Sequence, residues 1–287
     1  MKLTSYPSPA EFLAAAEPTL LRDEAKNNLI LGIADRVRSG RRYGDDPPVF
    51  VTVGDSDSVI AAAIRTPPFP VILHCETGCT DAIALLVDHL AEADPKLSGV
   101  NGETSVSEAF ARRWTERTGA AAEILREMRI YVLREVVPPT GIAGRLRSAA
   151  PGDVGLLAMW MRSFQEEAVP GDPPSNPAEI VRRFLDAGTL LLWEDNGPVS
   201  MAGSSRGTAN SSTVSAVYTP PEKRGHGYAS ACVAGLSQEI LDRGAAFCTL
   251  YADLANPISN KVYQRIGYRP VVDAVQYRFE LAGSEGG

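Results

Sequence analysis

The chain has few cysteines and no long apolar segment. Four cysteines in 287 residues are too few for a disulfide framework, so we expect reduced thiols. No apolar run approaches the ~18–20 residues that a membrane-spanning helix needs, and residues 1–7 contain no apolar signal segment. These absences predict a cytoplasmic protein with no membrane partner.

Clusters of positive charge are also missing. Lysine and arginine number 28 against 35 acidic residues, which gives a net charge of −7 and a pI near 5.1. Because nucleic acids and anionic lipids are bound by clustered cations, we expect no nucleic acid among the partners. The composition, 44% hydrophobic and 22% charged, is typical of a folded chain with a sizeable core, and the length fits two domains.

The cysteines occur as two pairs, Cys75/Cys79 and Cys232/Cys248. Neither pair has a further histidine or cysteine at metal-ligand spacing. We therefore predict no metal site and interpret all four residues as core or incidental thiols.

A short segment recurs 140 residues along the chain. Residues 55–63 and 195–203 share Asp, Val and Ala at matching positions. Each follows an apolar run, residues 49–53 and 190–193, and therefore predicts two strands joined by a tight turn. Asn196-Gly197 is a strong hairpin signal, because both residues tolerate positive φ.

Both halves continue with helices and strands in the same order. In the first half, helices are predicted over residues 8–16 and 25–39. A third helix begins at about Thr80, with Ile83, Leu86, Val87 and Leu90 on one face, and a fourth passes through Val106, Phe110 and Trp114. Strands are predicted over 70–74, 98–100, 121–125 and 130–137. In the second half, helices are predicted over 154–167, 177–187, 228–241 and 257–266, and strands over 213–218, 246–251 and 274–281.

This alternation predicts an α/β protein made of two copies of one fold. Consecutive prolines in residues 137–141 mark a linker, since they continue neither helix nor sheet. The predicted domains are therefore residues 1–139 and 140–287.

The loop over residues 217–230 carries the most specific chemistry. Gly225 and Gly227 let the backbone turn sharply and expose several N–H groups at the start of a predicted helix. The helix N-terminus favours an anion, Arg224 adds a cation, and Ala229 permits close approach. The pattern fits a pyrophosphate cradle, and the alternative is an ordinary glycine-containing loop between strand and helix.

Two segments of the second half resemble a known family. Arg224-Gly225-His226-Gly227-Tyr228-Ala229 is similar to the Arg/Gln-x-x-Gly-x-Gly/Ala signature of the GNAT acetyltransferase superfamily. Downstream, Asn256 is followed by Tyr263-Gln-Arg-Ile-Gly267-Tyr268, which resembles the family's Tyr-x-x-x-Gly-Phe/Tyr helix end. The resemblance covers residues 143–281 and, in the first half, only the order of elements. It implies two tandem GNAT-like domains, each a mixed, mostly antiparallel twisted sheet flanked by helices.

The resemblance also implies a role for each matching position. Acetyl-CoA, or another acyl-CoA, would be the co-substrate, held by the strand edge, the cradle and the later asparagines. Tyr263 would be the general acid that protonates the departing thiolate; alternatively, its ring packs one helix face. The predicted cofactor-binding residues are Val217, Tyr218, Thr219, Arg224, Gly225, His226, Gly227, Tyr228, Ala229, Ser230, Asn256 and Asn260.

A general base is not evident. An ammonium must lose a proton before it attacks a thioester, but the strand before the cradle carries no carboxylate, and Ser215 could only hold a water. Glu166 and Glu167 are candidates on a predicted helix, and a solvated helix face is the alternative. No residue is assigned as the base.

The corresponding loop of the first half lacks the cradle pattern. Residues 75–81 have one glycine, no arginine, and the acids Glu76 and Asp81. Carboxylates near a helix N-terminus bond its free N–H groups and repel phosphate. We therefore expect a degenerate first copy, which either forms one wall of the acceptor pocket or is purely structural.

These observations lead to a functional hypothesis. The second half would transfer an acetyl or other short acyl group from acyl-CoA to an amine on a small molecule. A protein N-terminus or lysine is an alternative acceptor, and an acyl-CoA-binding regulatory or interaction protein without turnover is an alternative class. The sequence specifies neither the acceptor nor the oligomeric state.

Overall fold

The chain passes twice between two units. The computed structural model of the protein describes residues 1–55, 58–76, 78–205 and 207–280. The first unit comprises residues 1–128 together with the chain from 272 onward, and the second comprises residues 129–271. The units differ from the expected halves, 1–139 and 140–287, because the final strand enters the sheet of the first unit.

The sheet of the first unit has one parallel pair among antiparallel neighbours. Its order is β1-β2-β3-β4-β5-β12, and only β4 and β5 run parallel, with Val71 opposite Val100 and Ile72 opposite Asn101. The short β1 is absent from the sequence prediction. The strands are β1 (Lys2–Ser5), β2 (Val49–Gly54), β3 (Val59–Arg65), β4 (Val71–Cys75), β5 (Gly99–Glu103) and β12 (Arg269–Glu280).

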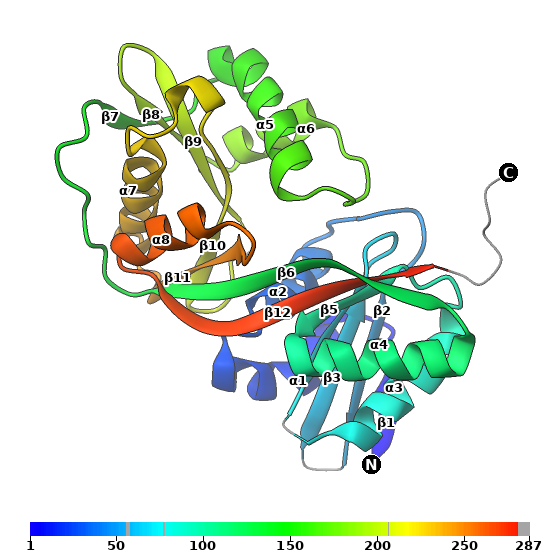
Figure 1. The fold of residues 1–287 in the computed structure, drawn as a ribbon. Coiled ribbons are helices and arrows are strands. Elements are labelled where there is room, and N and C mark those ends of the chain that lie inside the picture. The colour runs from blue at the N-terminus through cyan, green and yellow to red at the C-terminus, as the bar shows by residue number, and fades with distance from the viewer. Residues whose placement is uncertain (56–57, 77, 206, 281–287) are drawn as a thin grey trace, which may run out of the picture. The chain divides into compact units, whose positions relative to one another are not determined.

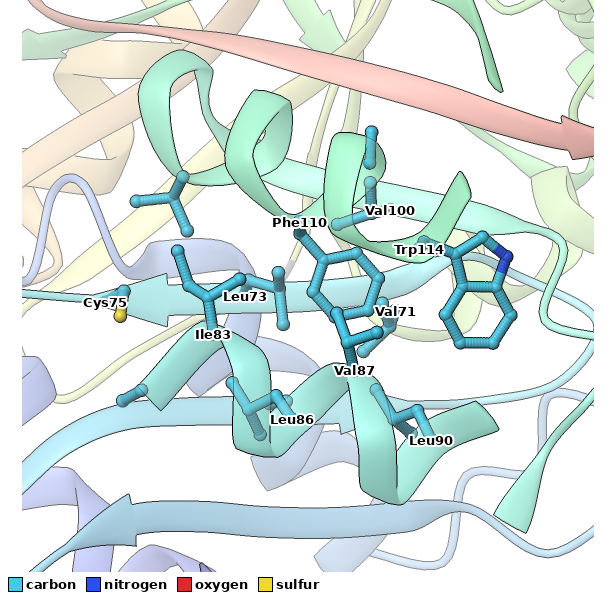
Figure 2. Packing of buried hydrophobic residues seen from close by; sticks show 14 of the residues in the cluster. Val71, Leu73, Cys75, Ile83, Leu86, Val87, Leu90, Val100, Phe110 and Trp114 are labelled. Atoms are coloured by element: carbon cyan, nitrogen blue, oxygen red, sulfur yellow. The ribbon is translucent and has the colours of Figure 1, made fainter. Parts of the chain in front are cut away.

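Helices cover both faces of this sheet. α1 (Pro9–Leu20) and α2 (Asn28–Arg38) pack on one face, and α3 (Thr80–Ala93) and α4 (Thr104–Thr118) on the other. Figure 2 shows how the apolar faces of α3 and α4 meet over β4. The predicted helix faces are confirmed, since all seven predicted apolar residues of α3 and α4 are buried. A fully buried Leu or Phe side chain contributes about 1.5–3 kcal/mol.

The second unit repeats this arrangement. Its order is β6-β11-β10-β9-β8-β7, and β10 and β11 form its parallel pair. Asn196 and Gly197 adopt φ of 54° and 121° in the turn between β8 and β9, which confirms the predicted hairpin. The strands are β6 (Ala121–Leu133, whose residues from Arg129 belong to this unit), β7 (Arg145–Ser148), β8 (Leu190–Glu194), β9 (Pro198–Ser205), β10 (Ser211–Tyr218) and β11 (Phe247–Asp253).

The helices of the second unit again lie on two faces. α5 (Val154–Ala168) and α6 (Pro177–Asp186) contact each other and pack on one face, whereas α7 (Tyr228–Asp242) packs on the other. α8 (Pro257–Arg265) contacts α7 and β11 (Figure 1). Like α1 and α6, α8 begins with a capping Ser or Asn followed by proline, which satisfies first-turn N–H groups. The two copies therefore share a mixed, mostly antiparallel sheet flanked by helices.

Two strand predictions differ from the structure. β6 is one continuous strand, whereas strands over 121–125 and 130–137 were predicted. The charged run over residues 126–129 suggests a break, but the exposed and half-buried positions of a strand accommodate charged side chains. The closing strand starts earlier than predicted, at Arg269, and its expected last residue, Leu281, lies outside the described residues. Residues 137–141 form neither helix nor strand, as predicted, but they lie within the second unit and not between the two units.

The prediction of four free thiols is wrong for one pair. Cys75 ends β4 and Cys79 immediately precedes α3, and a disulfide joins them. Their Cα atoms lie 6.3 Å apart, within the range that a disulfide bridges. Cys232 and Cys248 are free and buried, as expected of core thiols.

No helix in the described part of the chain is long and apolar enough to span a membrane.

Candidate active site

In the second unit, the parallel strands β10 and β11 stop pairing before β10 ends. The ladder between β10 and β11 runs from Ser211 to Thr213, although β10 continues to Tyr218. On its other side, β10 has a bulge, since three residue steps from Ser215 to Tyr218 face only two steps on β9. Within the bulge, Ala216 has a left-handed φ of 51°. A bulge frees backbone groups from the ladder, so this part of β10 can bond a ligand through its main chain.

The chain then turns into an uncapped helix. Gly225 and Gly227 adopt φ of 85° and 82°, a conformation in which other residues are strained. Gly227 is the residue before α7, and no side chain caps the helix. The first α-helical bond is from the Ala231 N–H to the Gly227 carbonyl. The N–H groups of residues 228–230 are therefore available to an anion, where the helix dipole also attracts negative charge.

Arg224 is held in place beside this helix start. Its Nε donates to the Thr219 carbonyl at 2.9 Å, and its Nη2 donates to Glu167 at 2.7 Å. The guanidinium also lies 5.8 Å from the centre of the Tyr218 ring. Glu167, a candidate base, is therefore the ion-pair partner of the predicted phosphate-binding cation. Nothing in the sequence links these residues, because they lie 57 positions apart.

Two aromatic rings stack at the start of α7. His226 stacks on Tyr228 with ring centres 5.5 Å apart, and its Nδ1 lies 2.9 Å from the Arg224 carbonyl. The Tyr228 hydroxyl donates to Asp195 at 2.6 Å, and this hydrogen bond raises the pKa of Tyr228. Asp195, in the turn between β8 and β9, thereby anchors the first residue of α7.

Tyr263 lies on α8 and packs against the core of the second unit. Its ring meets Tyr268 edge-on at 6.1 Å. Burial raises the pKa of Tyr263 to about 12, so the phenol keeps its proton at neutral pH, as a general acid must. The packing interpretation of its ring and the proposed acid role are compatible, since packing fixes the ring while the hydroxyl remains protonated.

The two asparagines bond within the protein. Asn256 caps α8 by accepting from the Ser259 N–H at 3.1 Å. Asn260 donates to the carbonyls of Asp253 and Asn256 at 2.7 Å each and accepts from the Tyr131 hydroxyl at 2.7 Å. These bonds shape the turn from β11 into α8. Direct contact of Asn256 and Asn260 with a cofactor stays a prediction.

The corresponding loop of the first unit has different partners. Glu76 pairs with Arg22 at 3.4 Å, and Asp81 lies in the first turn of α3. The disulfide closes the loop from Cys75 to Cys79, and Thr77 lies outside the described residues. The arginine that reaches this loop, Arg22, comes from outside it and is paired with Glu76, a contact that the sequence did not predict. Whether the first copy is degenerate in function stays a prediction.

Known proteins with similar sequence and structure identify the fold. Residues 196–278, which include the bulge, the loop and α8, match the family described as FR47-like protein. A GCN5-related N-acetyltransferase from Sphaerobacter thermophilus has a TM-score of 0.60 at 18% identity, with 96% of this chain and 95% of that one covered. The fold is that of the GNAT superfamily.

Two further solved structures share this GNAT fold over the whole chain. A GNAT-family acetyltransferase from Colwellia psychrerythraea has a TM-score of 0.58 at 10% identity and covers 98% of this chain and 100% of its own. A tandem GNAT protein from the clavulanic acid biosynthesis pathway has a TM-score of 0.56 at 12% identity, with 99% and 100% covered. No curated protein sequence matches the chain. The tandem GNAT architecture predicted from the sequence is confirmed.

Proposed function

We propose that the protein is an N-acyltransferase that moves an acetyl or other short acyl group from acyl-CoA to an amine on a small molecule. The observation that carries this proposal is the uncapped start of α7, with left-handed Gly225 and Gly227 directly after the bulged end of β10. The GNAT fold supports the choice of acyl-CoA over other phosphate-bearing ligands. The amine acceptor and the cytoplasmic location rest on the sequence prediction.

The backbone of this unit offers two kinds of contact to acyl-CoA. The N–H groups of residues 228–230 would hold the pyrophosphate, since no side chain competes for them. The main chain of β10 beyond Thr213 would pair with the pantetheine arm, because its ladder to β11 has ended. Within the bulge, the N–H of Val217 would polarise the thioester carbonyl.

Bound acyl-CoA would supply the thioester carbon that an amine attacks. Tyr263 would donate its proton, or a hydrogen bond, to the sulfur atom that departs. Its raised pKa keeps the phenol neutral throughout the pH range in which an amine is partly deprotonated. The amine would lose its proton through water, since β10 carries no carboxylate.

One observation favours acyl-CoA binding without turnover. Ser215, which could have held such a water, shares a hydrogen bond with Ser205 at 3.0 Å. The other polar side chains of residues 211–218 are also hydroxyls of Ser, Thr and Tyr, and none of them is a base at neutral pH. A binding protein with this site would retain the cradle and release no CoA thiol.

Calorimetric titration with acetyl-CoA, followed by thiol release with a panel of small amines, tests the proposal. The informative variant is Ser230→Asp, which places a carboxylate in the first turn of α7; Ser230→Asn is its uncharged control. We expect one site per chain, lost in Ser230→Asp and retained in Ser230→Asn, because only the charge repels pyrophosphate.

Each outcome of this experiment has a distinct meaning. Binding with amine-dependent thiol release supports the enzyme, and binding without release supports the alternative class. Two sites per chain would show that the Cys75–Asp81 loop also binds acetyl-CoA. No binding by the unmodified protein would overturn the proposal.

A further inference from the structure

A row of polar side chains crosses one face of the sheet in the first unit. This face is apolar under α1 and α2, where Ile64 and Ile72 pack. Toward the ends of β4 and β5, it carries His74, Asn101 and Glu103, because alternate residues of a strand share a face. Gln276 on β12 lies directly opposite Asn101 and extends the row. His74, Asn101 and Gln276 are only 7%, 9% and 8% exposed.

The parallel ladder ends inside this row. The last pair of β4 and β5 is Ile72 with Asn101, so His74 and Glu103 lie where these two strands no longer pair with each other. His74 still pairs with β3 and Glu103 with β12. His74 is two residues past the last pair, as Ser215 is two residues past Thr213 in the second unit. The first unit therefore places an imidazole where the second places a hydroxyl.

The hydrogen bonds of His74 identify its tautomer. Its Nδ1 lies 2.9 Å from Asn27 Oδ1, while Asn27 Nδ2 donates to the Leu20 carbonyl at 2.9 Å. Since the Asn27 oxygen can only accept, His74 Nδ1 carries the hydrogen and Nε2 has a lone pair. This Nε2 is buried and has no hydrogen-bond partner in the described part of the chain. A buried acceptor without a donor is unfavourable, so a hydrogen-bond donor supplied by a ligand would be favourable at Nε2.

The charges around His74 restrict the chemistry of that ligand. Lys26 Nζ lies 2.6 Å from Glu103 Oε2, and these side chains are 23% and 30% exposed, so the row reaches solvent at this pair. Lys26, Glu103 and Asp23 are the charges that act on His74. Burial and Lys26 lower the pKa of His74 to about 4, which keeps the imidazole neutral.

Elimination leaves one class of ligand. A carboxylate has no hydrogen to give to Nε2, and the charges of Lys26 and Glu103 already offset each other, so neither repays the desolvation of a buried ammonium or phosphate. Nowhere in the described residues do three His, Cys, Asp or Glu side chains come together as a metal site requires. A hydroxyl group can donate to Nε2 and accept from Lys26 or an amide at the same time. We propose that the first unit has its own binding site for a small, uncharged, hydroxyl-bearing molecule, held by His74, Asn101 and Gln276 and bordered by the Lys26–Glu103 pair.

Imidazole ¹⁵N spectra of the full chain test this site. The sequence has three histidines, so His89 and His226 serve as internal controls in the same spectrum. Titration with glycerol, and with the longer erythritol, should shift the His74 Nε2 resonance toward a hydrogen-bonded nitrogen with saturation, while the other two rings do not move. Ethylammonium and inorganic phosphate at equal ionic strength should leave His74 unchanged.

A matched pair of variants separates recognition from folding. Asn101→Leu removes the amide at similar volume and should weaken glycerol binding about 10-fold or more, as expected when a buried hydrogen bond is lost. Gln238→Leu makes the same kind of change on the exposed side of α7 and should have no effect. If Asn101→Leu does not fold, Glu103→Gln, which loosens the ion pair, should weaken glycerol binding by several-fold.

Three results would overturn the proposal. In the first, the ¹⁵N chemical shift of His74 Nε2 is already that of a hydrogen-bonded nitrogen without ligand and does not change with glycerol or erythritol. That result would show that Nε2 binds only a buried water. The His74 resonance could respond instead to ethylammonium or phosphate, which would assign the site to a charged ligand. It could also shift equally in the Asn101→Leu protein, which would place the ligand elsewhere. None of these results depends on acyl-CoA binding by the second unit.

Discussion

Arg224 donates to the carboxylate of Glu167 across 2.7 Å, and both side chains are about half exposed. The ion pair connects the last turn of α5 to the loop that precedes α7. A pyrophosphate at the start of α7 would compete with Glu167 for the same guanidinium. The pair therefore sets how much of the charge of Arg224 is available to a bound anion.

The first prediction is that Glu167→Gln tightens acetyl-CoA binding. An exposed ion pair contributes about 0.2–1 kcal/mol, so releasing Arg224 should lower the dissociation constant about 2- to 5-fold. Calorimetry at two salt concentrations measures this change, and the gain should shrink at high salt. Arg224→Ala is the reference and should weaken binding by about 1–3 kcal/mol. Unchanged affinity in both variants would place the Arg224 side chain outside the site.

The sequence predicted the fold more completely than the contacts of the site. The hairpin at Asn196-Gly197 and the amphipathic helices follow local rules, so each was visible in a short window of sequence. The ion pair of Arg224 with Glu167 joins residues that only the packing of α5 brings together. The tautomer of His74 likewise depends on Asn27, 47 positions away. The Cys75–Cys79 disulfide was missed because cysteine count alone argued for thiols, whereas the distance between their Cα atoms decides.

The second prediction concerns the two left-handed glycines of the loop. Alanine at Gly225 would meet nothing within 4 Å, but at Gly227 its Cβ would lie 2.8 Å from Ile142 Cδ1. Each substitution costs about 1 kcal/mol from the positive φ, and Gly227→Ala costs more through the contact with Ile142. Urea unfolding should therefore rank Gly227→Ala as the less stable variant. Adding Ile142→Ala to both proteins should narrow the difference, and a difference that persists would show that Ile142 is not its cause.

The third prediction separates catalysis from packing at Tyr263. Tyr263→Phe keeps the ring that packs on Tyr268 and removes the hydroxyl. We expect unfolding free energy within about 0.5 kcal/mol of the unmodified protein and a rate of acyl transfer lower by roughly 10²-fold. Acetyl-CoA affinity, measured by calorimetry, should not change. Equal rates in both proteins would leave Tyr263 with its packing role alone.

The fourth prediction is a pH dependence of stability that originates at His74. The folded protein holds this imidazole neutral until about pH 4, whereas the unfolded chain takes up the proton near its ordinary pKa of 6.5. Protons therefore favour the unfolded state between these values, and the contribution of neutral His74 is complete above pH 6.5 and is lost as the pH falls toward 4. A shift of this size corresponds to about 3 kcal/mol in total. Urea unfolding from pH 7 to pH 4.5 should show a smaller loss of stability for His74→Gln than for His89→Gln. Equal losses of unfolding free energy in the two variants would mean that the imidazole of His74 takes up a proton in the folded protein as readily as in the unfolded chain. Its Nε2 would then have no lone pair to accept a hydrogen bond from a ligand.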